Sequence, residues 1–184
     1  MGEFFNSLIK SLFGEQAEMQ RSERERVVEK RARREAAGSS PSLRNARLLN
    51  EIMMIAPRFI NTGGVNYDEG NCDWIMIPKY PLPERWEERW CKLLIVPPST
   101  YPNTPPIGFY LNREFHLKNG GTDSHFTGQA HHGAPDLKGQ GWFWYCVHMG
   151  TGSQGGWRPS ADYRQPDNLF TFLNMVRESL TNDF

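Results

Sequence analysis

Residues 97–106 read Pro-Pro-Ser-Thr-Tyr-Pro-Asn-Thr-Pro-Pro and follow an apolar, strand-like run at 90–96. A second run of this kind follows directly at 107–111. Each proline fixes its own φ and biases the residue before it toward extended geometry, so the segment cannot form a helix. The sequence therefore predicts a stiff connector between two strands, with another strand earlier in the chain, at 72–77.

An amphipathic helix is expected before these strands, because apolar residues recur there at helical spacing. Leu49, Ile52, Met53 and Ala56 stand at i, i+3, i+4 and i+7, and Pro57 ends the pattern.

Capping residues predict where the helices begin. Ser40 is expected to cap the first helix, with Pro41 in its first turn and an end near Ala56. Asp167 is expected to cap a closing helix. The apolar residues of that helix, at helical spacing, are Leu169, Phe172, Leu173, Val176 and Leu180.

The segments between these elements differ in composition. Residues 61–70 are polar and glycine-rich, which predicts a connection, and residues 118–140 form a long loop rich in Gly, His and Asp. Residues 142–148 are typical of a partly buried extended run. A glycine-rich crossing is expected at 150–156.

This order of elements resembles the ubiquitin-conjugating enzyme family over roughly residues 42–181. The resemblance implies an α+β fold: a four-stranded antiparallel meander with an N-terminal helix and a C-terminal packing helix. The residues that carry it are Arg47 to Ile52, the strand around Trp74, Lys92 to Pro97, Tyr101-Pro102, Pro105-Pro106, Cys146, Trp157-Arg158-Pro159 and a closing helix.

The resemblance also implies a function, since members of the family carry a ubiquitin-like protein as a thioester on one cysteine. We expect the chain to accept a ubiquitin-like protein from an activating enzyme and to transfer it to a lysine amine on a protein target. The chain stops soon after Leu180 and lacks the family's usual asparagine, as in the bacterial branch. That branch is associated with antiphage-defence operons that encode an activating enzyme, a ubiquitin-like protein and a metallopeptidase.

Cys146 is the expected acceptor cysteine. A thiolate is a strong nucleophile and can hold an acyl group. In the family this cysteine follows soon after a glycine, precedes a Trp-x-Pro element and is not on the core sheet; Gly141, Trp157 and Pro159 fill the matching places. The other two cysteines, Cys72 and Cys91, are expected to be small buried residues on strands of the meander.

The chain departs from the family at the oxyanion partner, because it has no His-Pro-Asn triplet before the cysteine. It offers His125, His131 and His132 instead. A histidine can position the loop, donate to a developing oxyanion or act as a base. We expect His132 to take the place of the missing partner, with His131 as the second choice, because the adjoining Gly-Ala-Pro sequence most resembles the family's turn. The alternative is that these histidines are solvent-facing loop residues.

Asp162 is a further candidate, since a carboxylate can orient an acceptor lysine. In the family the acidic gate usually lies beyond the next helix. Trp157 is expected to be a packing anchor that fixes the crossing after Cys146, with Arg158 exposed.

Composition narrows the classes of function. Lysine plus arginine and aspartate plus glutamate each total 21, so no global charge favours nucleic acid or an anionic membrane. Three cysteines at irregular spacing disfavour a disulfide framework and suit a reducing, cytoplasmic setting. The sequence contains no run of about 18 apolar residues, so no membrane span is expected. No cofactor is expected.

The chain is expected to have three parts: a helical extension at 1–37, a linker at 38–41 and the catalytic domain at 42–184. Apolar residues near the start form a short stripe, followed by a helix of alternating charge. The stripe can pack back on the domain, dock on a partner or touch a membrane surface. It consists of Phe5, Leu8, Ile9 and Leu12.

Two other classes of function stay open. The first is an inactive binding module that keeps the scaffold, with Cys146 incidental. The second is different chemistry on the same residues: a thiol hydrolase that pairs Cys146 with a histidine, or a metal site. Zinc needs three or four ligands, and no Cys-x-x-Cys pair is present, so we expect no metal. The possible ligands would be His125, His131, His132 and Cys146.

Overall fold

The computed structural model describes residues 42–126, 129–147 and 156–182. The chain divides into two units, Met1–Ser40 and Pro41–Phe184. The expected extension at 1–37 and linker at 38–41 lie outside the described residues, as does most of the glycine-rich crossing.

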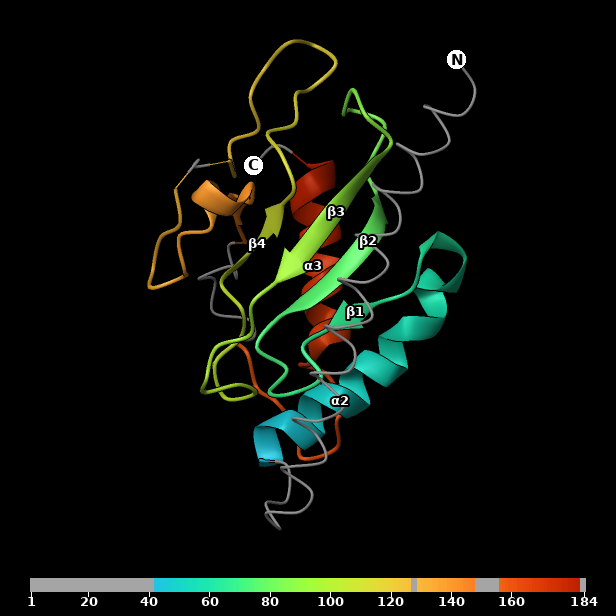
Figure 1. Cartoon of the computed structure of the whole chain (residues 1–184), viewed down its shortest axis with the longest axis vertical. Coiled ribbons are helices and arrows are strands. Elements are labelled where there is room, and N and C mark those ends of the chain that lie inside the picture. Colours follow the sequence, from blue (N-terminus) through green and yellow to red (C-terminus); the bar gives the residue numbers. More distant parts are fainter. Residues whose placement is uncertain (1–41, 127–128, 148–155, 183–184) are drawn as a thin grey trace, which may run out of the picture. The chain divides into compact units, whose positions relative to one another are not determined.

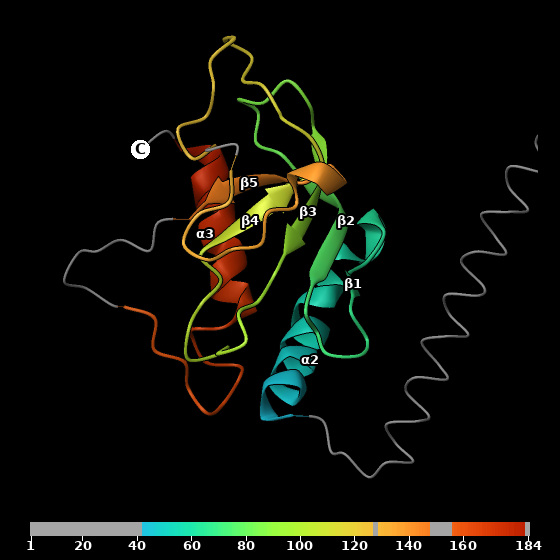
Figure 2. The same cartoon turned by 60° about the vertical axis from the view of Figure 1, so that its left-hand side comes forward.

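The second unit is an α+β domain built on a five-stranded antiparallel sheet, with its strands in chain order from β1 to β5 (Figures 1 and 2). Strands β2 to β5 form the four-stranded meander expected from the resemblance, which is confirmed. The added strand β1 pairs with β2 at the sheet edge, within the segment that was expected to be only a connection. The strands are β1 (Asn66–Tyr67), β2 (Ile75–Pro81), β3 (Trp90–Ile95), β4 (Gly108–Leu111) and β5 (Phe143–Cys146).

Strand β2 begins three residues later than predicted. The Asp68 carboxylate accepts hydrogen bonds from the backbone of Gly70 and Asn71, and the Cys72 amide donates to the Asp68 carbonyl. These bonds close a turn over 68–72 in place of a strand. The strand then runs past its expected end to Pro81, because a register shift between residues 77 and 80 accommodates the proline at 78.

Helix α2 spans Leu43–Ile55 and continues as a 3-10 helix, η1, over Ala56–Thr62. The expected cap at Ser40 is wrong: Ser42 caps α2, because its hydroxyl accepts a hydrogen bond of 3.2 Å from the Asn45 amide. The proline at 57 lies at the start of η1, where a missing N–H costs little.

Helix α3 spans Leu169–Thr181. The expected cap at Asp167 is also wrong by one residue. Asn168 caps α3 by accepting from the Thr171 amide at 3.0 Å, while the Asp167 carboxylate accepts from the Arg158 amide at 2.6 Å. Asp167 therefore holds the segment that precedes the helix.

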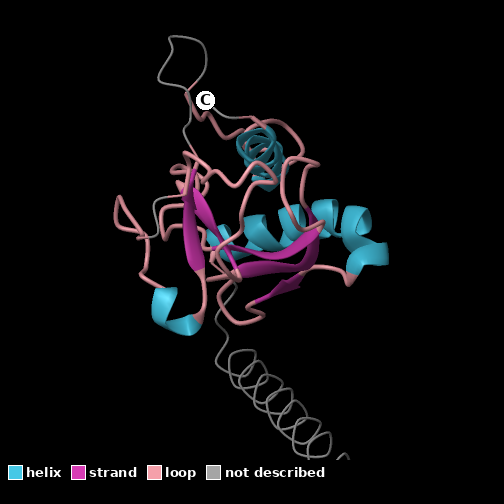
Figure 3. Cartoon of the chain, turned by 90° about the horizontal axis from the view of Figure 1, so that it is seen from above, coloured by secondary structure: helices cyan, strands magenta, loops and turns pink. Residues whose placement is uncertain are grey.

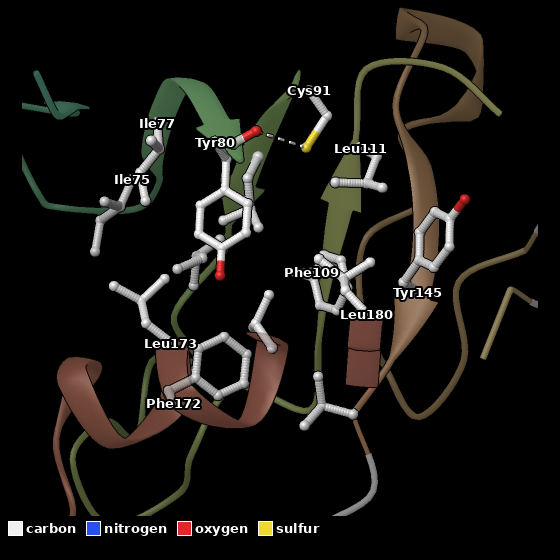
Figure 4. Close-up of a cluster of buried hydrophobic side chains, with 14 of the residues drawn as sticks. Ile75, Ile77, Tyr80, Cys91, Phe109, Leu111, Tyr145, Phe172, Leu173 and Leu180 are labelled. Carbon is white, nitrogen blue, oxygen red and sulfur yellow. Dashed lines mark hydrogen bonds between the residues drawn. The ribbon is translucent and has the colours of Figure 1, made fainter. Parts of the chain in front are cut away.

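The main core lies between one face of the sheet and the two long helices. Figure 4 shows Phe172 and Leu173 of α3 pointing toward Tyr80 of β2, and Phe109 of β4 beside Tyr145 of β5. The rings of the latter pair stack with centroids 5.4 Å apart. We call this face of the sheet the helix face.

The opposite face, which we call the outer face, carries a second apolar cluster centred on Leu94, Tyr110 and Trp144. The loop before β5 covers this cluster, and the Tyr110 hydroxyl donates to the Pro135 carbonyl at 2.6 Å. A short 3-10 helix of this loop, η2 (Lys138–Gln140), lies across the strands from α2 and α3 (Figure 3). Ala130, Ala134, Leu137 and Trp142 pack on the cluster.

The proline-rich connector is fixed to α2 by buried and partly buried polar contacts. The Arg44 guanidinium donates to the carbonyls of Pro97 and Pro98, at 3.0 Å each. The Tyr101 hydroxyl donates to the Glu51 carboxylate, which is fully buried. The connector is thus non-helical, as its prolines predict, and it is also tied to the helix.

Glu51 joins three parts of the domain. Besides the Tyr101 hydroxyl, its carboxylate accepts from Arg47 one turn earlier in α2 and from the Leu169 amide at the start of α3, the latter at 2.8 Å. Arg47 also donates to the Ser160 carbonyl at 2.5 Å. Both helices and the connector therefore share one buried carboxylate.

Candidate active site

Cys146 is the last residue of β5 and pairs with Gly108 of β4. Its Sγ lies 4.0 Å from the Ile107 carbonyl oxygen, and the residue is 8% exposed. Burial raises the pKa of the thiol. The expectation that this cysteine stands off the core sheet is wrong, because the backbone at 146 still pairs in the ladder. The crossing that follows, at 148–155, lies outside the described residues.

Trp144 determines what lies beside Cys146 on the sheet. Side chains of a strand alternate between faces, so Trp144 and Cys146 both point to the outer face. A Cβ added at Gly108 would come within 2.3 Å of two carbons of the Trp144 indole. The indole thus covers the backbone of Gly108, directly across the ladder from Cys146.

His125 lies on the other side of Cys146. Phe126 forms an antiparallel bridge with Tyr145, and the Cys146 amide donates to the His125 carbonyl at 3.0 Å. Residues 125 and 146 therefore stand opposite each other and share the outer face. His125 is 5% exposed. The sequence offered this histidine as a candidate but could not reveal its register with the cysteine.

The turn that carries His125 is held by buried charges. The Asp123 carboxylate accepts from the His125 amide at 2.8 Å and forms an ion pair with Arg85. Arg85 also donates to the Thr181 carbonyl at 3.4 Å, and its neighbour Trp86 donates from Nε1 to the Leu180 carbonyl at 2.8 Å. The position of His125 is thereby fixed relative to the end of α3.

His131 and His132, the favoured candidates, are exposed residues of the loop over the outer face. Their ring centroids are 6.4 Å apart, and the Ala134 amide donates to the His131 carbonyl at 3.1 Å. His132 has a φ of 57°, which is uncommon for a residue with a side chain. The loop shares the outer face with Cys146, but no hydrogen bond in the described part of the chain joins either imidazole to the thiol.

Asp162 occupies an exposed turn. Its carboxylate accepts from the Arg164 amide at 3.0 Å, and its own amide donates to the Ser160 hydroxyl at 3.2 Å. Among residues 42–126, 129–147 and 156–182, no hydrogen bond or ion pair links Asp162 to Cys146. The structure therefore gives Asp162 a local bond within its own turn.

Trp157 packs as an anchor for the chain that returns from Cys146. Its Nε1 donates to the Pro102 carbonyl at 2.5 Å, and its ring lies 6.2 Å from that of Tyr101. Arg158, beside it, is exposed as expected.

Cys72 and Cys91 belong to the core on the helix face. Burial raises the pKa of the Cys72 thiol to about 11 and that of Cys91 higher still. Cys91 lies on β3 as predicted, whereas Cys72 lies in the turn before β2, with a φ of 55°. Neither thiol reaches the outer face.

Within the described residues, no three His, Cys, Asp or Glu side chains are placed to hold a metal ion. No helix in the same part of the chain is long and apolar enough to cross a bilayer.

Comparisons with known proteins identify the family. Neither the curated proteins nor the solved structures gave a match. Among protein families, Prokaryotic E2 family E matches residues 56–183. The match covers all five strands and α3, which agrees with the ubiquitin-conjugating fold described above. This chain belongs to Prokaryotic E2 family E.

Proposed function

We propose that this chain accepts a ubiquitin-like protein from an activating enzyme as a thioester on Cys146 and transfers it to a lysine amine of a protein target. Family membership supports the class of reaction. The position of Cys146 is the observation that carries the assignment. Of the three cysteines, it alone points to the outer face, at a strand end, while Cys72 and Cys91 lie in the core.

The reaction would have two steps. The Cys146 sulfur loses its proton and attacks the carbonyl carbon of the incoming thioester, and the thiolate of the activating enzyme leaves. A lysine amine then attacks the same carbonyl carbon, the bond from that carbon to the Cys146 sulfur breaks, and one proton of the amine passes to a base, so that an amide and the Cys146 thiolate form. Because burial raises the pKa of Cys146, removal of its proton is a distinct requirement of the first step.

The loop histidines and Asp162 would act in the second step. His131 and His132 are exposed on the loop over the outer face, the face to which Cys146 points. There they would take a proton from the attacking lysine amine and donate a hydrogen bond to the oxyanion that develops on the carbonyl. Asp162, also exposed, would help to orient the amine. Backbone amides of the glycines in the loop would add further donors.

We also propose a setting for this activity, namely a cytoplasmic conjugation pathway of the antiphage-defence kind. The resemblance of the chain to the bacterial branch supports it. The partners would be an activating enzyme, a ubiquitin-like protein and a protein target.

A second candidate function is a binding module that retains the scaffold without the chemistry. One observation favours it: Cys146 is 8% exposed and its pKa is raised, which makes a poor nucleophile at neutral pH. On this reading the domain would bind the activating enzyme or the ubiquitin-like protein without forming a covalent bond.

A charging assay separates the two functions. The protein is mixed with ATP and with the activating enzyme and ubiquitin-like protein encoded in the same genome, and its intact mass is measured. The proposal expects a reductant-sensitive adduct that Cys146→Ala abolishes and Cys72→Ala retains. A stable complex without any mass increase would instead support the binding module.

A further inference from the structure

We propose that His125 is the base that takes the proton of Cys146 when the thiol attacks the incoming thioester. The inference rests on the proposed function and adds a residue to it. It assigns the two steps of the reaction to different histidines. His125, beside the thiol, acts when the ubiquitin-like protein is loaded onto Cys146, and the exposed pair His131 and His132 on the loop acts when it is transferred to the lysine.

The register of the sheet carries this proposal. Phe126 bridges Tyr145, so His125 and Cys146 are a directly opposed antiparallel pair. The Cβ atoms of such a pair lie about 4.5–5.5 Å apart on the same face, which brings an imidazole nitrogen within reach of a thiol by side-chain rotation. The bond from the Cys146 amide to the His125 carbonyl fixes this register at 3.0 Å.

On the opposite side, the described neighbour of Cys146 carries no titratable group. Across β4, Cys146 faces Gly108, which has no side chain, and the Trp144 indole covers that position. The Ile107 carbonyl oxygen, 4.0 Å from Sγ, can accept a hydrogen bond but cannot take the proton away.

The surroundings of His125 hold it in place and are charged. Asp123 accepts from the His125 amide and pairs with Arg85, which comes from the segment between β2 and β3. Tyr145 of β5 points to the helix face, away from Cys146, and burial raises the pKa of its phenol. The charged groups that hold the turn of His125 are therefore an oppositely charged pair.

The proton and bond changes balance as follows. The S–H bond of Cys146 breaks, and its proton passes to an imidazole nitrogen of His125. The sulfur forms a bond to the carbonyl carbon, and the bond from that carbon to the sulfur of the activating enzyme breaks. The imidazolium then gives its proton to the departing thiolate, which returns His125 to its neutral form.

The inference can be tested without any partner, by measuring how fast iodoacetamide alkylates Cys146 at different pH values, with peptide mapping to isolate this thiol. If the thiol gives its proton to the His125 imidazole, the pair neither gains nor loses a proton as the reactive thiolate–imidazolium form appears, so the population of that form is constant over the neutral pH range in which the pair holds one proton. The rate should then be nearly flat over that range in the unchanged protein. In His125→Gln it should rise about tenfold per pH unit and be about tenfold slower near pH 7.

His116→Gln is the matched control, because His116 is exposed and its carbonyl accepts from the Glu87 amide away from β5. It should keep the flat profile. A rate in the unchanged protein that climbs about tenfold per pH unit over the whole range, or no labelling at neutral pH, would overturn the proposal even if His125→Gln does not fold. Equal profiles in the folded variant would overturn it too. Failure of charging with a flat alkylation profile would count against the proposed function and leave the His125 pair standing.

Discussion

The indole of Trp144 lies against the backbone of Gly108, so close that a Cβ at residue 108 would come within 2.3 Å of two ring carbons. Gly108 pairs with Cys146, and Trp144 precedes that cysteine by two residues on the same face. The absence of a side chain at 108 therefore allows β4 and β5 to pair where the candidate nucleophile stands.

Replacing Gly108 with alanine should lower the free energy of unfolding by about 1 to 3 kcal/mol, because the methyl group forces the indole or the strand to move. Chemical denaturation measures this change. Gly139→Ala is the control, since a Cβ there meets no atom within 4 Å, and it should be nearly neutral. If the two variants are equally stable, the contact does not constrain the strand pair.

Replacing Glu51 with glutamine should destabilise the domain by about 2 to 4 kcal/mol, because Arg47 and the Tyr101 hydroxyl lose a fully buried carboxylate. Denaturation gives the size of the loss. Glu178→Gln, at an exposed position of α3, should change stability by less than about 0.5 kcal/mol. A Glu51 variant as stable as this control would mean that the shared carboxylate does not hold the helices to the connector.

Replacing His131 and His132 together with alanine should slow discharge of the charged protein to free lysine by about 100-fold, the low end for lost acid–base help. The melting temperature should stay nearly constant, because both side chains are exposed. Single-turnover discharge and a thermal scan measure the two quantities. Unchanged discharge would make the pair ordinary loop residues, and a large drop in melting temperature would make them structural.

Deleting residues 1–37 should leave the melting temperature unchanged and weaken charging by limiting amounts of activating enzyme. The apolar stripe near the start would be worth roughly 1.5 to 3 kcal/mol for each side chain buried in a partner's groove. Replacing Leu8 and Leu12 with serine in the full chain is the matched control and should weaken charging equally. A truncated chain that melts much earlier but charges normally would assign the extension to the fold.

Much of the fold could be predicted from local chemistry. The prolines of the connector, the helical spacing of Leu49 and Ile52, and the Tyr101-Pro102 pair carry short-range information, and the structure confirms the elements that they indicate. The errors are at element ends. There, the side chain of a residue such as Asp68 or Asn168 accepts a hydrogen bond from the backbone. Several neighbouring residues have side chains that can form the same bond, so the sequence does not indicate which of them does.

The candidate site was predicted less completely. The resemblance selected Cys146, but its place in the ladder depends on how β5 pairs with Gly108, and its partner depends on a bridge between residues 126 and 145. His125 precedes Cys146 by 21 positions in the chain. Such long-range register leaves no local pattern in the sequence. The sequence instead favoured His132, because the residues that adjoin it resemble the family's turn.

The most direct test of the whole account is the fate of the adduct in Cys146→Ser, measured by intact mass with the activating enzyme, the ubiquitin-like protein and ATP. A serine at 146 should form an oxyester that reductant leaves intact, whereas the adduct of the unchanged protein should be released as a thioester. An adduct that survives in Cys146→Ala, or one that reductant still releases from Cys146→Ser, would contradict the assignment of Cys146 as the residue that carries the ubiquitin-like protein.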